Sequence, residues 1–161
     1  QLHIIPVSIS YEYDPCDQAK ARELAIRAST GSYSKAQGED DASIALGITG
    51  YKGRVHLHFG NEMSGHYEDA KQLAVALDQV ILSHYRLFPV HYLAYAMWSE
   101  QDPDIQVPQL AGLFAADDLR RAEGEWQRRL DNCPAEYRNS LIMQYANPVR
   151  SHYRIKTGLP L

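Results

Sequence analysis

Two short stretches near the beginning of the chain alternate apolar and polar residues. Residues 5–11 carry an apolar side chain at every second position, and residues 54–59 repeat the pattern. A period of two is typical of β-strands, but a lone pair of strands is only marginally stable in water. We therefore expect an incomplete sheet whose apolar side chains lack enough partners, which favours a fragment of a larger domain.

The two predicted strands divide their side chains between an apolar and a polar face, because successive residues of a strand point to opposite sides. Pro6 falls on the polar face and has no N–H, so it suits a strand start, an edge or a bulge. His56 and His58 share the polar face of the second strand. The apolar faces comprise Ile5, Val7, Ile9 and Tyr11 in the first strand and Val55, Leu57 and Phe59 in the second.

Most of the remaining chain shows the three- and four-residue steps of amphipathic helices. Asp14 and Pro15 predict the start of a helix, and Gly31 predicts its end after Thr30. The predicted fold class is α/β, with two or so N-terminal strands followed by a mostly helical region. Further helices are expected over residues 42–49, 67–87, 90–98, 116–132 and 134–147, the last interrupted at Asn147-Pro148.

The composition is typical of a soluble globular domain, since 45% of the 161 residues are hydrophobic and 22% are charged. A net charge of −4 provides no basic field for a nucleic acid. Cys16 and Cys133 match no metal or redox spacing and predict two reduced thiols in a cytosolic protein, with one disulfide as the alternative. Charged residues and a proline interrupt the apolar-rich residues 73–98, which predicts a core element and leaves peripheral membrane contact open.

His56 and His58 form the most suggestive chemical pattern, because both imidazoles can reach one metal ion from the same side of a strand. Glu62 or His66 is a candidate third ligand. The alternative is that both histidines simply bond to neighbours or water. His-x-His is a pattern of low specificity, so we assign no metal site and keep a metal-binding protein as the weakest alternative function.

Other candidate residues are more readily explained as structural. Ser8, Ser10 and Cys16 lie in no Gly-x-Ser-x-Gly turn and have no assignable base, so none is predicted to be a nucleophile. The charged helix that carries Arg128 and Arg129 mixes both signs, which indicates a solvated, ion-paired surface. An aromatic run is either a lipid-binding groove or simply core. Its members are Tyr85, Phe88, Tyr92, Tyr95 and Trp98.

Three stretches resemble the phospholipid/glycerol acyltransferase family, in particular its bacterial glycerolipid members. Residues 4–13, IIPVSISYEY, are similar to the family's fourth motif, an apolar strand that contains a proline. Residues 50–60, GYKGRVHLHFG, resemble the strand that follows it, and residues 85–95 provide the third stretch. The resemblance covers most of residues 4–95, and it implies the C-terminal part of an acyltransferase α/β domain over residues 1–98, with a helical extension over residues 99–161.

The resemblance implies transfer of a fatty acyl group from a coenzyme A or acyl-carrier-protein thioester to the hydroxyl of a glycerol phosphate or lysophospholipid, without a cofactor or metal. The family uses a histidine of a His-x-x-x-x-Asp motif as the general base. No histidine of this chain has an aspartate five positions later, and the only Glu-Gly, Glu123-Gly124, lacks the context of the family's phosphate-binding motif. We therefore expect no catalytic residue here and no activity of the chain alone.

Ile5, Pro6 and Val7 match the fourth motif and are predicted to help wall the acyl or acceptor pocket, with plain sheet core as the alternative. The implied partners are the missing N-terminal half of the catalytic domain, an acyl thioester and a lipid acceptor, and self-association stays open. The implied location is cytoplasmic, with contact at the inner face of the bacterial membrane left open. The alternative function is a non-catalytic lipid- or protein-binding module built on the aromatic helices.

Overall fold

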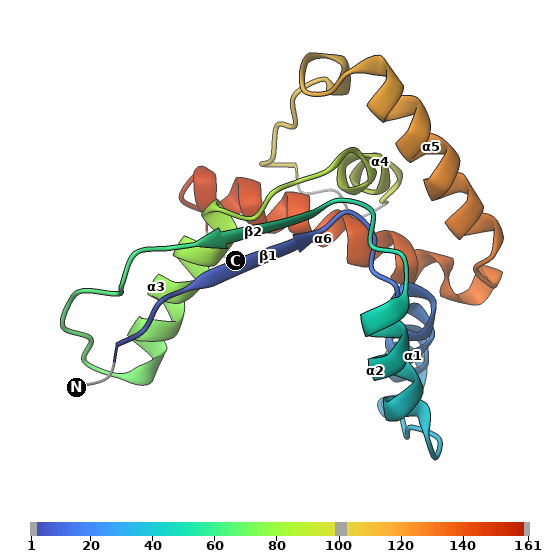
Figure 1. Cartoon of the computed structure of the whole chain (residues 1–161), viewed down its shortest axis with the longest axis horizontal. Helices are drawn as coiled ribbons and strands as arrows, with labels where there is room; N and C mark the ends of the chain where they lie inside the picture. The colour runs from blue at the N-terminus through green and yellow to red at the C-terminus, as the bar shows by residue number, and fades with distance from the viewer. Residues whose placement is uncertain (1–2, 99–102, 160–161) are drawn as a thin grey trace.

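The structure is a computed structural model that describes residues 3–98 and 103–159. These residues form a small, mostly helical α/β protein with one two-stranded antiparallel sheet and six α-helices, in agreement with the predicted class (Figure 1). The elements are β1 (Val7–Tyr11), α1 (Asp17–Thr30), α2 (Glu39–Thr49), β2 (Val55–Phe59), α3 (Ala70–Ser83), α4 (Pro89–Met97), α5 (Ala116–Asp131) and α6 (Arg138–Lys156), with short 3-10 helices at Leu110–Gly112 and Ala135–Tyr137.

Helix α1 ends as predicted but begins later. Gly31 takes a left-handed conformation with φ of 81°, and its N–H donates to the Arg27 carbonyl, which the absence of a Cβ permits. At the other end Asp14 does not cap the helix. Its Oδ1 atom instead accepts from the N–H of Cys16 at 2.8 Å, a local turn that competes with helix for this side chain.

Helix α6 runs through Pro148, so the predicted interruption at Asn147-Pro148 is wrong. A proline inside a helix removes one backbone hydrogen bond and crowds the carbonyl four residues earlier, at a cost of about 3 kcal/mol. Burial on both sides of Pro148 offsets that cost, because Tyr145, Ala146 and Val149 all lie in the core. Tertiary packing thus overrides the local signal.

The core lies between α4, α5 and α6. The T-shaped contact between Trp126 of α5 and Tyr145 of α6, with ring centroids 5.0 Å apart, is one of its aromatic contacts. Phe88, Tyr92, Tyr95 and Trp98 are buried in the same cluster, and Tyr85 is partly buried. The core interpretation of the aromatic run is therefore confirmed, and this core joins residues before and after position 98.

The sheet lies beside this core, with α3 and α6 on one side of it (Figure 1). Val7 pairs with Phe59, Ile9 with Leu57 and Tyr11 with Val55. The segment after α3 crosses the same side of the sheet, because the N–H of Arg86 donates to Ser10 Oγ at 2.8 Å. Helices α1 and α2, which separate the two strands in sequence, both lie at the same end of the sheet (Figure 1). We call the side toward α3 the inner face.

Within residues 3–98 and 103–159, no helix has both the length and the apolar character needed to cross a membrane.

Candidate functional site

The sheet buries its polar side chains and exposes its apolar ones. Ser8, Ser10 and Glu12 of the inner face are almost inaccessible. On the outer face seven large apolar side chains are between 36% and 70% exposed, and we call this set the apolar sheet face. It comprises Ile5, Val7, Ile9, Tyr11, Val55, Leu57 and Phe59.

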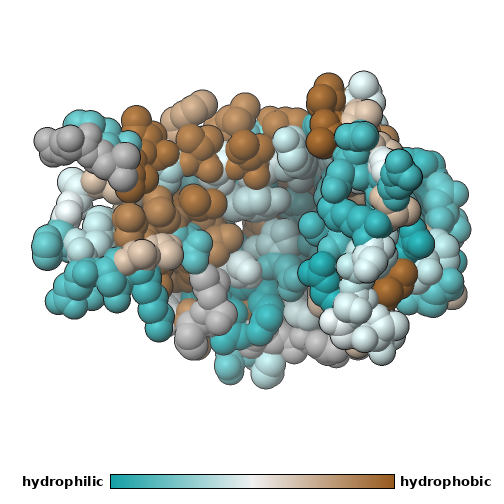
Figure 2. Space-filling model, turned by 90° about the horizontal axis from the view of Figure 1, so that it is seen from below, coloured by the Kyte–Doolittle hydropathy of each residue, from teal (hydrophilic) through white to brown (hydrophobic). Residues whose placement is uncertain are grey.

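Figure 2 shows hydrophobic residues gathered over the half of the molecule that holds β1, β2 and α3, whereas the end with α1 and α2 is largely hydrophilic. An exposed apolar patch of several side chains, on the order of several hundred Å², marks an interaction surface. The sheet-core interpretation is therefore wrong for Ile5 and Val7, which lie exposed on the apolar sheet face. Pro6 is buried on the inner face, so the three predicted wall residues do not share one surface.

The backbone of the sheet is open along its edges. The N–H of Gly60 donates to the Pro6 carbonyl and that of Glu12 to the Arg54 carbonyl, so the even-numbered residues of β1 form the hydrogen-bonded pairs of the ladder. The N–H and C=O groups of the odd-numbered residues consequently point away from the partner strand. The residues that expose apolar side chains therefore also direct their backbone groups outward.

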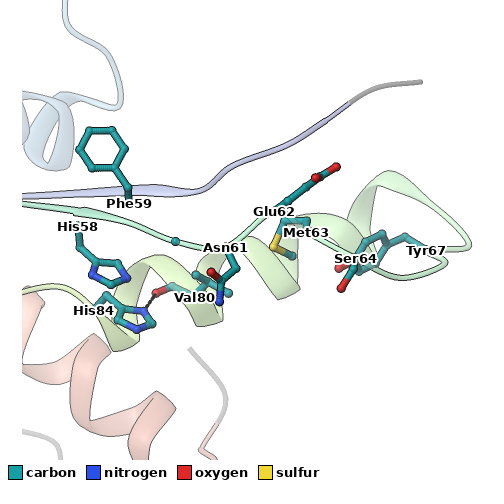
Figure 3. Close-up of a pocket in the computed structure, with 10 residues that line it drawn as sticks. His58, Phe59, Asn61, Glu62, Met63, Ser64, Tyr67, Val80 and His84 are labelled. Atoms are coloured by element: carbon teal, nitrogen blue, oxygen red, sulfur yellow. Dashed lines mark hydrogen bonds between the residues drawn. The ribbon is translucent and has the colours of Figure 1, made fainter.

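A cavity of about 380 Å³ opens between β2, the loop that follows it and α3. His58 and His84 point toward each other at its wall, while Phe59 points to the opposite side of the sheet (Figure 3). The two imidazole rings stack almost in parallel, with centroids 3.9 Å apart. His84 Nδ1 lies 2.8 Å from the Val80 carbonyl, which requires a proton on that nitrogen.

The electrostatics of this pair favour a neutral His58. Burial lowers the pKa of His58, and the neighbouring His84 and His56 lower it further. His56 and His58 share the inner face as predicted, but the predicted third ligand Glu62 contacts His3 instead. Among the described residues, no group of three or more His, Cys, Asp or Glu side chains is placed to hold a metal ion. The arrangement there is a stacked imidazole pair.

The other candidate nucleophiles have structural surroundings. Ser8 and Ser10 are buried on the inner face, where Ser10 Oγ accepts from the Arg86 backbone. Cys16 and Cys133 are free thiols. Burial raises the pKa of Cys16, and Asp14 and Asp17 raise it further, so this thiol is not activated as a thiolate.

A buried ion pair joins three helices that are distant in sequence. Arg129 Nη1 of α5 contacts Asp17 Oδ2 of α1, and the Tyr145 hydroxyl of α6 donates to the same carboxylate oxygen at 2.8 Å. Arg129 also donates to the Asp14 carbonyl at 3.0 Å. Only 7% of Arg129 is exposed, so the prediction of a solvated, ion-paired surface is right about the ion pairing at this position and wrong about the solvation.

A second pair fixes the end of the sheet. Both carboxylate oxygens of Glu12 accept from the Arg54 guanidinium, at 2.7 and 2.9 Å. The Arg54 side chain reaches Asp118 of α5 at 3.3 Å as well. The hydrogen bonds from Arg54 hold the pKa of Glu12 below its usual value despite the opposing effect of burial. Bidentate pairs of this kind fix geometry, and here they tie β1 and β2 to α5.

Comparison with known proteins finds no matching family model, curated protein or solved structure.

Proposed function

We propose that this chain is part of a glycerolipid acyltransferase and that its apolar sheet face packs against the portion of the enzyme that holds the reaction centre. The observation that carries the proposal is the exposure of all seven apolar strand side chains on one face. The three stretches that resemble the acyltransferase family include both strands.

The alternative of a stand-alone binding module receives less support. That proposal depends on an exposed aromatic groove, and four of the five aromatic residues, from Phe88 to Trp98, are buried in the core. A self-sufficient module is also expected to cover its strand edges. The sheet of this chain leaves the apolar side chains of both strands exposed.

In the proposed enzyme this chain shapes the substrate pocket and takes no part in proton transfer. Ile5 and Val7 lie on the apolar sheet face, where they can wall the pocket for the acyl chain or acceptor. Pro6 acts indirectly from the inner face, because its carbonyl accepts from Gly60 and thereby pairs the strand ends. The general base and the phosphate-binding group are residues of the rest of the enzyme, which also binds the acyl thioester as a substrate.

The test is acyl transfer from a long-chain thioester to lysophosphatidate, followed by thiol release. The chain alone is compared with a version extended N-terminally through the parent gene, and we expect turnover only in the longer version. Val7→Lys in the longer version should abolish activity, whereas Ile44→Lys, a matched change at an exposed position of α2, should not. Activity of the chain alone, or none in the folded longer version, contradicts the proposal.

A further inference from the structure

The outer edge of β2 is an unprotected strand edge. The backbone groups of Val55, Leu57 and Phe59 point away from β1 and make no hydrogen bond within residues 3–98 and 103–159. Val55–Phe59 contains no proline, and its pairing with β1 continues without a bulge. Prolines, charges and bulges are the devices by which proteins keep such edges from pairing.

The edge of β1 differs at one end. The Tyr11 backbone, which also points outward, lies beside His91 of α4, and both residues line one small cavity. Each apolar residue of β1 is less exposed than the residue of β2 with which it pairs, and Phe59 is the most exposed at 70%. The edge of β2 is therefore the more available of the two for another strand.

The sequence of β2 is complementary to itself in the antiparallel direction. Centred on Leu57, the pairing sets Val55 of one copy opposite Phe59 of the other, and Leu57 opposite itself. A β-branched residue opposite an aromatic one is a favourable cross-strand pair. The outward backbone groups fall in the hydrogen-bonded positions of this register, so about six backbone hydrogen bonds can form.

Charges beside the strand are compatible with the same register. Arg54 falls opposite Gly60 of the second copy, which avoids a like-charge contact. Beyond the strand, Lys52 Nζ donates to the Ile48 and Gly50 carbonyls and Glu62 contacts His3, so neither charge opposes the register. A two-fold axis through Leu57 repeats each contact, as in an isologous interface.

We propose that β2 pairs with β2 of a second copy of this chain, antiparallel about Leu57, and so joins the two sheets into one four-stranded sheet. A sheet of three or more strands with a hydrophobic face is more stable than an isolated pair, which provides the driving force. The two apolar sheet faces lie on the same side of the joined sheet. The inference goes beyond the proposed function and does not depend on it, because it uses the edge of the sheet rather than its face.

The test is sedimentation equilibrium under reducing conditions over a wide range of protein concentration. We expect a monomer–dimer equilibrium. Leu57→Lys sets two like charges opposite each other at the axis and should weaken the dimer about tenfold or more. Ile9→Lys makes the same change on the apolar sheet face at the position paired with Leu57, and should leave the dimer intact.

Two proline variants distinguish a dimer formed through the strand edge from a dimer formed through the apolar sheet face. Leu57→Pro removes an outward N–H at the edge of β2 without removing a bond to β1, and Ile9→Pro does so at the edge of β1. Only Leu57→Pro should dissociate the dimer, with circular dichroism confirming that both variants fold. A monomer at all concentrations, or equal sensitivity to changes at Leu57 and Ile9, overturns the proposal. Acyl transfer by the longer version is scored separately, so the two proposals can fail independently.

Discussion

His91 Nδ1 accepts a hydrogen bond from the backbone N–H of Phe88 at 3.0 Å, within the helical core. Burial lowers the pKa of His91 to about 4, although a backbone hydrogen bond with Tyr11 acts in the opposite direction. The side chain is therefore neutral at neutral pH. It satisfies an otherwise unpaired donor at the start of α4.

We predict that the free energy of unfolding falls as the pH is lowered from about 6.5 to 4. The unfolded chain binds a proton at the ordinary histidine pKa, whereas folded His91 does so only near 4, so acid favours the unfolded state. The loss from this residue reaches about 3 kcal/mol below pH 4. Urea denaturation across this range should show a smaller loss in His91→Gln, which keeps an acceptor, but not in the exposed control His66→Gln. Equal losses in all three proteins contradict the assignment.

Two neighbouring arginines should differ sharply in their effect on stability. Arg129→Ala leaves the buried Asp17 carboxylate without its charged partner and should cost about 3–5 kcal/mol. Arg128→Ala removes an exposed guanidinium from Glu125, which keeps its pair with Arg129, and should cost less than about 1 kcal/mol. The midpoints of urea denaturation of the two variants measure the difference. Similar midpoints would show that the buried pair of Arg129 and Asp17 does not contribute more to stability than the pair of Arg128 and Glu125.

Gly53 should not tolerate a side chain, whereas Gly47 should. Gly53 has φ of 63°, and an added Cβ would approach Tyr13 Cδ2 to 2.7 Å. Gly53→Ala should therefore destabilise the protein by at least about 1–3 kcal/mol. Gly47 lies within α2 with open space around it, so Gly47→Ala should stabilise by about 1 kcal/mol. Thermal unfolding tests both expectations, since the midpoint should fall in Gly53→Ala and rise in Gly47→Ala.

Replacing Pro148 should stabilise the protein. Pro148→Ala restores a donor to the Gln144 carbonyl within α6, and we expect a gain of about 1–2 kcal/mol after the greater freedom of the unfolded chain is allowed for. Pro134 lies before the 3-10 helix at Ala135–Tyr137, with φ of −52°. Pro134→Ala should instead lower stability slightly, by about 0.4–1 kcal/mol. A loss on replacing Pro148 would mean that the ring is needed for packing.

The metal alternative has a direct test of its own. Exhaustive dialysis against a chelator should leave the thermal midpoint unchanged, because the described residues provide His56 and His58 with no third ligand. Adding Zn²⁺ to the dialysed protein should likewise produce no rise in the midpoint. A rise that disappears in His58→Gln would restore the metal-binding alternative.

Local sequence patterns predicted where the helices and strands lie, but they predicted less well which of their faces are covered by other parts of the chain. Period-two alternation located both strands, and Gly31 located the end of α1, because strand pleating and the left-handed cap depend on neighbouring residues alone. The same alternation separated Ile9 from Ser10 correctly, yet it carries no information about which face is covered. That depends on where α3 and α6 pack.

The imidazole pair and the buried ion pair were missed for a related reason. His84 falls among the apolar steps of its helix, a signal that it faces the sheet, and His58 falls on the strand face that turned out to be the inner one. Together these signals indicate the stacked pair. No local pattern links Asp17 to Arg129, because their contact forms only when α1 and α5 meet.

The strand pairing closes a long loop. Val7 meets Phe59 only after α1 and α2 have been enclosed between them, a loop of about 50 residues whose closure costs roughly 3–4 kcal/mol of chain entropy. The helical core also closes long loops, because α4 and α6 form its most extensive contact although about 40 residues separate them in sequence. The sheet, however, has only two strands and leaves one face uncovered, whereas Leu141 of α6 is fully buried. Amide protons of the ladder, such as those of Ser8 and His56, should therefore exchange with solvent deuterium through partial openings that leave Leu141 protected. On this basis the sheet and the helical core are two cooperative units with separate opening energies.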